Sequence, residues 1–554
     1  MHLILNSVPR PVLYTLAPFV AVALLLAVVR LYTTLSYYQS LRQFGDNNTP
    51  GKRDVTPPQI PYTLPWLGNT LGFLTNRPGQ FWRELFVWYP RSTGVCTVLI
   101  GGQKTHILFA PAAVQALFKA RSPSRDVFEH ELFSTVFQLP DEQIRNAEAG
   151  KHHEHEMNAR YLTRPERVNE LTEHFTRVLD QVLSQDAQDV TSLGEIGLYS
   201  WLRDRMFTAS TTALMGEQLL QMYPEFCEDF FGFDGDFLKF FFKLPEFSMR
   251  EAVARRAKIF ERFQVWGREM LRLSGGHVVD PEGPAWEPFF GARLNRARQL
   301  DFRVRNLNDR TAATLNVGMI FGLSSNVIPA TNWMLMEILK PDAEPTLLPR
   351  VMEELCQAEK PDGSIDIPTL VSQPLLQSIW TETLRLYMDV LVTRNLSEDI
   401  SLPLDEDGKH HVLLRKGGNV FTPSYLGHHD PDSWSGKASH NTFCAERFYT
   451  LDPDTKKGVF SMTGFNGKFF PFGGGRTICP GRVFAKQEGL GALAMILLKF
   501  EFEVKGYRDV DGKPTGAFPG FAKAYPGSGA LTPGGDMMVR MKLRDRKAGV
   551  RSIA

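Results

Sequence analysis

One cysteine near the end of the chain has neighbours that suit metal chemistry. Cys479 lies in the run GGGRTICPG, after three glycines and before a proline, and an apolar helical pattern follows. Glycines let a backbone turn where a Cβ would collide with a flat group. Free amide N–H groups and the helix dipole stabilise a thiolate that lies just before a helix. The segment therefore favours a thiolate ligand of haem iron, and a structural cysteine in a glycine-rich turn is the alternative.

This run resembles the cysteine loop of the cytochrome P450 family, whose pattern is F-x-x-G-x-R-x-C-x-G. The matching positions are Phe472, Gly475, Cys479 and Gly481. Thr477 stands where the family usually has an arginine that pairs with a haem propionate, and Arg476 lies one place early. The resemblance implies haem as the cofactor, Cys479 as the axial ligand of its iron, and Phe472 and Gly475 as cofactor-binding residues. The run TICPGR is similar to the branch with sterol 7α-hydroxylases, sterol 12α-hydroxylases and prostacyclin synthase.

A long apolar segment in the middle of the chain is the second notable feature of the sequence. Residues 311–339 predict one long buried helix, with a kink at Pro329 because proline cannot donate to the Ser325 carbonyl. By resemblance this is the helix that crosses the distal face of the haem. The family commonly has an acid and a threonine there, which help deliver protons to dioxygen, but here Ile328 and Pro329 occupy those positions. The resemblance leaves Asn326 and Ser325 as the candidate catalytic residues.

A second group of polar residues is spaced for a structural role. Glu382 and Arg385 are three residues apart and share a helix face, although an exposed pair of this kind contributes little. With Arg447 in the run FCAERF, they resemble the E-x-x-R helix and the E-R-F segment of the family. The resemblance implies a buried network that holds residues 449–470 beneath the cysteine loop. It also implies that Arg394, which follows a threonine in a predicted strand, binds a haem propionate.

The N-terminal segment carries a localisation signal. Residues 11–29 contain no charge and are long enough to cross a bilayer as a helix. Arg10 precedes them, and the basic residues that follow are Arg30, Arg42, Lys52 and Arg53. The positive-inside rule then places the rest of the chain in the cytosol, and a cleaved signal peptide is the alternative. We expect a single-pass endoplasmic reticulum protein with an anchor, a Pro-rich linker and hinge, and a haem domain, at residues 1–31, 32–68 and 69–554.

The amino-acid composition argues against several classes of protein function. The 554 residues include 62 Lys and Arg against 61 Asp and Glu, so no basic excess argues for nucleic acid. Five scattered cysteines form no CxxC pair, which indicates neither a disulfide framework nor a zinc site. The run KHHEHE at residues 151–156 lacks the HExxH spacing, so a solvated helix is favoured over a metal site. The 40 phenylalanines suit a large apolar interior or pocket, and residues 226–247 are the most aromatic stretch.

These observations predict a mainly α protein with a small β part, the cytochrome P450 fold and an N-terminal transmembrane helix. The resemblance implies a haem-thiolate monooxygenase for a lipophilic substrate, such as a terpenoid, a sterol or another natural product of secondary metabolism. Its electrons would come from NADPH through a cytochrome P450 reductase, which would dock on a basic face made by Lys468, Arg482 and Lys486. Two alternatives stay open: a haem-thiolate isomerase or dehydratase that needs no reductase, and a non-catalytic haem-binding or ligand-binding protein.

Overall fold

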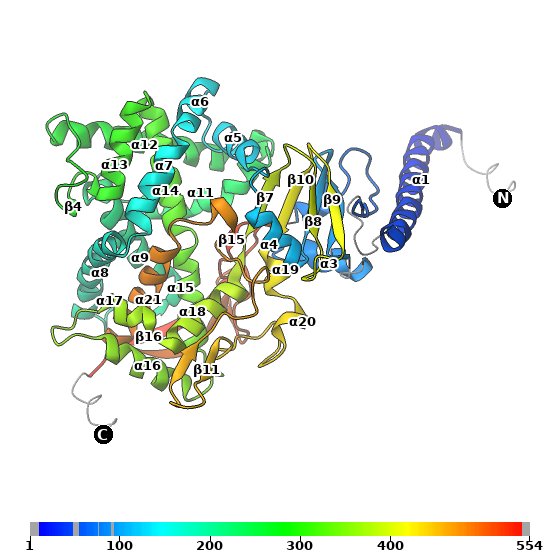
Figure 1. Cartoon of the computed structure of the whole chain (residues 1–554). Helices are drawn as coiled ribbons and strands as arrows, with labels where there is room; N and C mark the ends of the chain where they lie inside the picture. Colours follow the sequence, from blue (N-terminus) through cyan, green and yellow to red (C-terminus); the bar gives the residue numbers. More distant parts are fainter. Residues whose placement is uncertain (1–9, 48–54, 76, 90–92, 546–554) are drawn as a thin grey trace.

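The computed structural model describes residues 10–47, 55–75, 77–89 and 93–545. The first nine residues of the predicted anchor, and residues 48–54 of the predicted linker with Lys52 and Arg53, lie outside this range. About 53% of the chain is helical, which confirms the predicted fold class. Helices fill one side of the molecule, and short strands gather between them and α1 (Figure 1).

The helices have the following bounds: α1 Arg10–Asn47, α2 Thr70–Phe73, α3 Gln80–Trp88, α4 Pro111–Lys119, α5 Asp126–Thr135, α6 Asp141–Ala149, α7 Lys151–Leu162, α8 Pro165–Gln188, α9 Leu198–Met215, α10 Gln218–Met222, α11 Phe226–Phe241, α12 Arg250–Leu273, α13 Arg293–Val304, α14 Asp309–Ser324, α15 Val327–Leu339, α16 Leu347–Ala358, α17 Ile367–Ser372, α18 Pro374–Tyr387, α19 Ser424–His428, α20 Pro431–Trp434 and α21 Arg482–Lys499. The short 3₁₀ turns are η2 Glu246–Ser248 and η3 Gly475–Thr477.

The strands have the following bounds: β1 Val95–Ile100, β2 Gln103–Leu108, β3 Glu195–Gly197, β4 Trp286–Glu287, β5 Gly291–Ala292, β6 Met388–Asp389, β7 Leu391–Asn395, β8 Ile400–Pro403, β9 His411–Leu414, β10 Asn419–Pro423, β11 Tyr449–Leu451, β12 Gly458–Phe460, β13 Phe500–Asp509, β14 Pro514–Thr515, β15 Gly529–Ala530 and β16 Gly535–Leu543. The two four-stranded sheets have the orders β1-β2-β10-β7 and β14-β13-β16-β3. Strands β1 and β2 form an antiparallel hairpin, and β13 pairs antiparallel with β16 near the C-terminus. The strand pair β15–β6 joins the C-terminal region to the end of α18.

Helix α1 extends well beyond the predicted anchor. It continues through residues 32–47, which the sequence had assigned to the linker. The hydroxyl of Thr33 donates a hydrogen bond to the carbonyl of Tyr62 at 2.8 Å, and Tyr37 and Phe44 are buried. The stretch Leu16–Gly45 is long and apolar enough to cross a membrane, and almost none of its most apolar part is buried. Only the later part of α1 therefore packs on the rest of the protein.

The predicted central helix is interrupted. Helix α14 ends at Ser324 and α15 begins at Val327, so Ser325 and Asn326 separate the two. Both linking residues keep backbone angles of the α region, so the interruption is a local irregularity at the Ser325 carbonyl, where the sequence predicts the kink. Pro329 lies in the first turn of α15, where a missing N–H costs no helical hydrogen bond, while its ring would clash with the Ser325 carbonyl of a continuous helix. The break exposes backbone and polar side chains inside an otherwise apolar segment.

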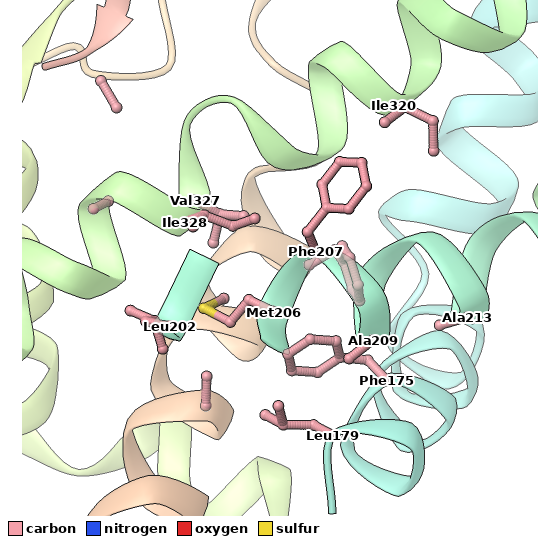
Figure 2. Close-up of a cluster of buried hydrophobic side chains, with 14 of the residues drawn as sticks. Phe175, Leu179, Leu202, Met206, Phe207, Ala209, Ala213, Ile320, Val327 and Ile328 are labelled. Atoms are coloured by element: carbon pink, nitrogen blue, oxygen red, sulfur yellow. The ribbon is translucent and has the colours of Figure 1, made fainter. Parts of the chain in front are cut away.

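The main hydrophobic core surrounds this interrupted pair of helices. Figure 2 shows side chains from α8, α9, α14 and α15 that meet in it, among them Phe175, Met206, Phe207, Ile320 and Ile328. Helix α11 contributes more aromatic side chains, of which Phe226, Phe230, Phe233 and Phe240 are buried. These four side chains pack in the large apolar interior that the phenylalanine content suggested. The core thus fixes α15 and its first turn against the rest of the protein.

Candidate functional site

Cys479 lies between the turn η3 and the first turn of α21. Its backbone N–H donates to the carbonyl of Phe472 at 3.0 Å, which closes the loop. Burial raises the pKa of the Cys479 thiol, whereas the backbone amide of Gly481 and the charge and amide of Arg482 act in the opposite direction. The start of α21 therefore favours a thiolate at this position, but in the protein alone the effect of burial is larger.

The glycine run before this cysteine packs closely on α4. Gly473 and Gly475 have φ values of +71° and +68°, which favour glycine. A Cβ on Gly475 would lie 2.5 Å from the carbonyl oxygen of Phe118, and a Cβ on Gly474 would overlap the Phe118 ring. The sequence had attributed the glycines to the approach of a flat group. Within the protein itself, Gly474 and Gly475 are required by Phe118 of α4.

Arg394 on β7 joins this loop through a buried guanidinium. Its amines donate to the carbonyls of Thr393 at 2.8 Å and Gly474 at 3.0 Å, and to the hydroxyl of Thr477 at 2.8 Å. Only 5% of its surface is exposed, and within the described residues no carboxylate lies within ion-pairing distance of it. Burial, with repulsion from Arg125 as a smaller effect, lowers the pKa of Arg394 to about 10. Burying a charged guanidinium without a counter-ion costs free energy, so an anion bound next to Arg394 would stabilise it.

Asn326 and Ser325 occupy the break between α14 and α15. The Oδ1 of Asn326 accepts a hydrogen bond from the backbone N–H of Ala530 at 2.8 Å, and its Nδ2 lies 3.4 Å from the Ser325 hydroxyl. That hydroxyl donates to the carbonyl of Phe321 at 2.6 Å. Ile328 is fully buried in the main core (Figure 2), so the residue at the acid position of the family pattern packs among apolar side chains.

Glu382, Arg385 and Arg447 form the buried network expected from the sequence. Two nitrogens of Arg385 donate to the Glu382 carboxylate at 2.7 and 2.8 Å, and the Nε of Arg447 lies 2.9 and 3.0 Å from its two oxygens. Arg385 also donates to the carbonyls of His428 and His440 at 2.8 and 2.7 Å. The network therefore ties α18 to the two segments that lead into the cysteine loop.

Lys468, Arg482 and Lys486, the residues proposed as the docking face for a reductase, differ in their contacts. The ammonium of Lys486 donates to the side chain of Gln377 at 2.7 Å, and burial lowers its pKa to about 8. Arg482 is half-buried and donates to the carbonyl of Cys479 at 3.0 Å. Arg476, which the sequence did not include in that face, is exposed. The displaced arginine of the loop is therefore on the surface, and Lys486 is a poor docking cation.

The histidine-rich run forms the solvated helix α7. His152 and His153 are mostly exposed, and no metal-ligating group of three occurs among the described residues. Arg160, near the end of α7, pairs with Glu282 at 2.9 Å. Arg160 is therefore paired with a carboxylate of the same chain at the protein surface.

The residues at the cysteine loop fit a haem. Cys479 supplies a half-buried sulfur directly before α21, and Arg394 supplies a buried cation that forms no ion pair with a carboxylate of the described residues. Sequence reasoning missed three residues that shape this region, Phe118, Gly529 and Ala530, because each acts through a contact with a distant segment.

Comparisons with known proteins agree with this geometry. Residues 291–524 match the family model described as Cytochrome P450. Cytochrome P450 monooxygenase calL of Penicillium decumbens is 29% identical, over 89% of this chain and 94% of the relative. Cytochrome P450 monooxygenase efuG of Hormonema carpetanum is 27% identical, over 95% and 96%. Prostacyclin synthase of Homo sapiens is 24% identical, over 89% and 94%.

The chain contains a cytochrome P450 domain and is similar along most of its length to cytochrome P450 monooxygenases; the P450 family is a family of oxidoreductases. Its relatives include sterol 7α- and 12α-hydroxylases as well as prostacyclin synthase, which confirms the branch indicated by the TICPGR run. Haem with a thiolate ligand is the cofactor that this family implies.

Proposed function

We propose that this protein is a membrane-anchored haem-thiolate monooxygenase that oxidises a lipophilic substrate. The observation that carries the proposal is the half-buried sulfur of Cys479, which lies directly before α21 in a loop closed by the hydrogen bond from the Cys479 backbone N–H to the Phe472 carbonyl. When bound, the haem supplies an iron whose thiolate ligand favours cleavage of the O–O bond. Cys479 is the proposed axial ligand.

The surrounding residues have roles that follow from their contacts. Phe472 accepts the hydrogen bond that fixes Cys479, and Gly475 allows the loop to lie against α4. Arg394 is the proposed partner of a haem propionate, since it has the charge and the burial for an anion. Asn326 and Ser325 are the proposed catalytic residues, because they are the polar groups at the break of the central helix.

The substrate class is proposed from the apolar elements near this break. The ring of Phe237 on α11 stacks on Phe321 of α14 with centroids 4.1 Å apart, and Phe242 meets Tyr525 edge to face at 6.0 Å. Aromatic walls of this kind suit a terpenoid, a sterol or a similar natural product. The monooxygenase names of the two fungal relatives support a role in secondary metabolism.

The cellular setting is proposed from α1. An apolar helix of this length suits a single-pass anchor, and the basic residues after it favour a cytosolic catalytic domain at the endoplasmic reticulum. Electrons would come from NADPH through a flavoprotein reductase. Lys468 and Arg482, now joined by the exposed Arg476, are the proposed docking cations.

The test uses the full-length protein in membranes with a reductase, NADPH and a lipophilic extract. A monooxygenase yields a metabolite that is heavier than its precursor by one oxygen atom, and only when NADPH is present. Products of unchanged mass, formed without NADPH, would refute the proposal.

A second candidate is a haem-thiolate isomerase or dehydratase. It is favoured by Ile328 and Pro329, which leave the break without the acid and the threonine that commonly serve dioxygen activation. Turnover of a hydroperoxide alone, with no effect of NADPH and reductase, would establish this alternative.

A further inference from the structure

Trp333 of α15 and Tyr387 of α18 form a parallel ring stack in the protein interior. Their ring centroids are 4.2 Å apart, the ring planes are 5° from parallel, and both residues are buried. Among the described residues this is the one ring contact between a tryptophan and a tyrosine. Apart from thiols, indole and phenol are the side-chain groups that lose a single electron most readily, so the contact joins two redox-active groups.

The phenol of Tyr387 has a proton acceptor in place. Its hydroxyl donates a hydrogen bond to Oε1 of Glu337, a buried residue one turn after Trp333 on α15. Burial raises the pKa of Glu337, and the contacts with Tyr387 and Lys340 oppose that shift. The ammonium of Lys340 lies 2.9 Å from the second carboxylate oxygen, which favours the ionised form. A phenol that loses an electron becomes a strong acid, so its proton would pass to Glu337.

The stack is fastened to the backbone beside the break of the central helix. The indole Nε1 of Trp333 donates to the carbonyl of Leu531 at 2.5 Å, and the N–H of Leu531 donates to the carbonyl of Tyr387 at 2.8 Å. The preceding residue, Ala530, donates to Asn326 at 2.8 Å. Trp333 follows Asn326 by two helical turns, a rise of about 10 Å. The stack is therefore close to the polar groups that the proposed function places at the haem.

A further pair of aromatic contacts leads from the stack towards the surface. The ring of Phe518 lies beside Trp333 with centroids 6.0 Å apart, and Tyr507 of β13 meets Phe518 edge to face at 5.8 Å. Tyr507 is half-buried, so solvent reaches it. These rings form a path from the stack to a phenol that a soluble reductant can meet.

We propose that Trp333 and Tyr387 form an internal one-electron donor that serves the haem site when an oxidant forms there without a substrate. The inference rests on the proposed function, which supplies that oxidant from a hydroperoxide, or from dioxygen and a reductase. One electron leaves the stack for the haem site, the Oη–H bond of Tyr387 breaks, and the proton moves to Oε1 of Glu337. A soluble thiol returns one electron through Tyr507, and the proton returns from Glu337 to Tyr387. Each cycle removes one oxidising equivalent from the haem site and oxidises one thiol by one electron.

Four variants separate the parts of this relay, and thermal unfolding shows that each is folded. Tyr387→Phe keeps the ring stack and removes the phenol. Glu337→Gln keeps an oxygen that accepts the hydrogen bond but does not take the proton. Tyr507→Phe removes only the outer phenol. The matched control is Tyr223→Phe: Tyr223 is also buried and donates to the carboxylate of Asp229 at 2.6 Å, but within the described part of the chain no tryptophan ring lies against it.

The first measurement needs no haem. A laser flash removes electrons from indole rings whether or not they are buried, and indolyl and phenoxyl radicals differ in absorption. In the wild type, part of the indolyl absorption should decay while phenoxyl absorption rises. Tyr387→Phe should lose this phase, and Tyr223→Phe should keep it. Glu337→Gln should slow it about a hundredfold, the lower end of what a positioned base contributes.

Three results of the flash experiment would overturn the inference. They are a wild type without the coupled phase, a phase that persists in Tyr387→Phe, and a phase that Tyr223→Phe also loses. Because this experiment needs no haem, it decides on the stack even if the purified protein binds none. Failure to bind haem would count against the proposed function alone.

The second measurement uses the haem-loaded protein with hydrogen peroxide and no substrate. Electron paramagnetic resonance of rapidly frozen wild type should show a tyrosyl radical, whose signal narrows when the tyrosine rings are deuterated. Tyr387→Phe should lose the radical and bleach its haem faster than the wild type, and Tyr223→Phe should do neither. Glutathione should remove the radical more slowly from Tyr507→Phe than from the wild type. Haem-loaded wild type without the radical, equal bleaching in Tyr387→Phe, or equal removal in Tyr507→Phe would contradict the relay.

Discussion

The Nε of Arg447 lies 2.9 and 3.0 Å from the two carboxylate oxygens of Glu382, a residue 65 positions earlier in the chain. Glu382 is fully buried and also binds Arg385 and the backbone N–H of Cys444. One carboxylate therefore compensates two buried guanidiniums. A buried ion without its partner raises the free energy of the folded state. The packing of the segments around Glu382 therefore depends on its carboxylate.

The first prediction follows from that dependence. Replacing Glu382 by Gln leaves Arg385 and Arg447 without a counter-charge, and should lower the free energy of unfolding by about 3 kcal/mol or more. Thermal and chemical unfolding of the purified protein measure this loss. The control is Glu446→Gln, because Glu446 forms a partly exposed pair with Arg350 at 2.6 Å and should cost no more than about 1 kcal/mol. Equal effects of the two variants would show that the network does not hold the fold.

The resemblance to the family predicted this network, because its parts are short local runs that can be matched one by one. Spacing alone places Glu382 and Arg385 on one helix face, and only the resemblance added Arg447 and the burial. The cysteine loop was predictable for the same reason. A contact between distant segments leaves no such pattern, so nothing in the sequence linked Asn326 to Ala530.

The glycines show a related limit of the sequence. A run of three predicts a close approach but does not name the approaching atom, which is Phe118 for Gly474 and Gly475. The course of α1 beyond residue 31 was missed because the Pro-rich segment suggested a linker, whereas Tyr37 and Phe44 find buried sites. The sequence predicted Lys486 as a surface cation, because its contact with the side chain of Gln377 leaves no local pattern.

The second prediction concerns Arg394, the buried arginine of β7 that contacts the cysteine loop. If Arg394 binds a propionate, Arg394→Gln should weaken haem retention about tenfold, since hydrogen bonds to charged groups are worth more than neutral ones. Arg394→Lys keeps the charge without the planar fork and should give an intermediate loss. The ratio of haem to protein after gel filtration measures retention. Arg476→Gln is the matched control and should keep its haem, because Arg476 is exposed. Loss of haem in that control instead would reverse the assignment.

The third prediction is a pH dependence of stability from Glu488. Burial raises the pKa of this carboxyl to about 8, and a hydrogen bond from Ser210 opposes the shift. The folded protein therefore keeps a proton that the unfolded chain, with its ordinary value of 4.5, releases. Glu488 thus contributes stability that is fully present below about pH 4.5 and is lost as the pH rises through about 8.

Its test is the difference in unfolding free energy between the wild type and Glu488→Gln from pH 5 to 8. Because Gln does not titrate, the unfolding free energy of the wild type should fall relative to that of the variant as the pH rises. The fall should be at most about 1.4 kcal/mol per pH unit. Glu173→Gln at an exposed site is the control and should show a constant difference. A constant difference for Glu488→Gln as well would mean that Glu488 is ionised in the folded protein.

The fourth prediction tests the sulfur of Cys479 as the ligand of the haem iron, on which the whole account rests. The absorption spectrum of the reduced protein under carbon monoxide should contain the strongly red-shifted band of thiolate-ligated iron. Cys479→Ser should lose that band, while Cys356→Ser, at an exposed cysteine of α16, should keep it. A folded wild type that lacks the band, or a Cys479→Ser variant that retains it, would contradict the account.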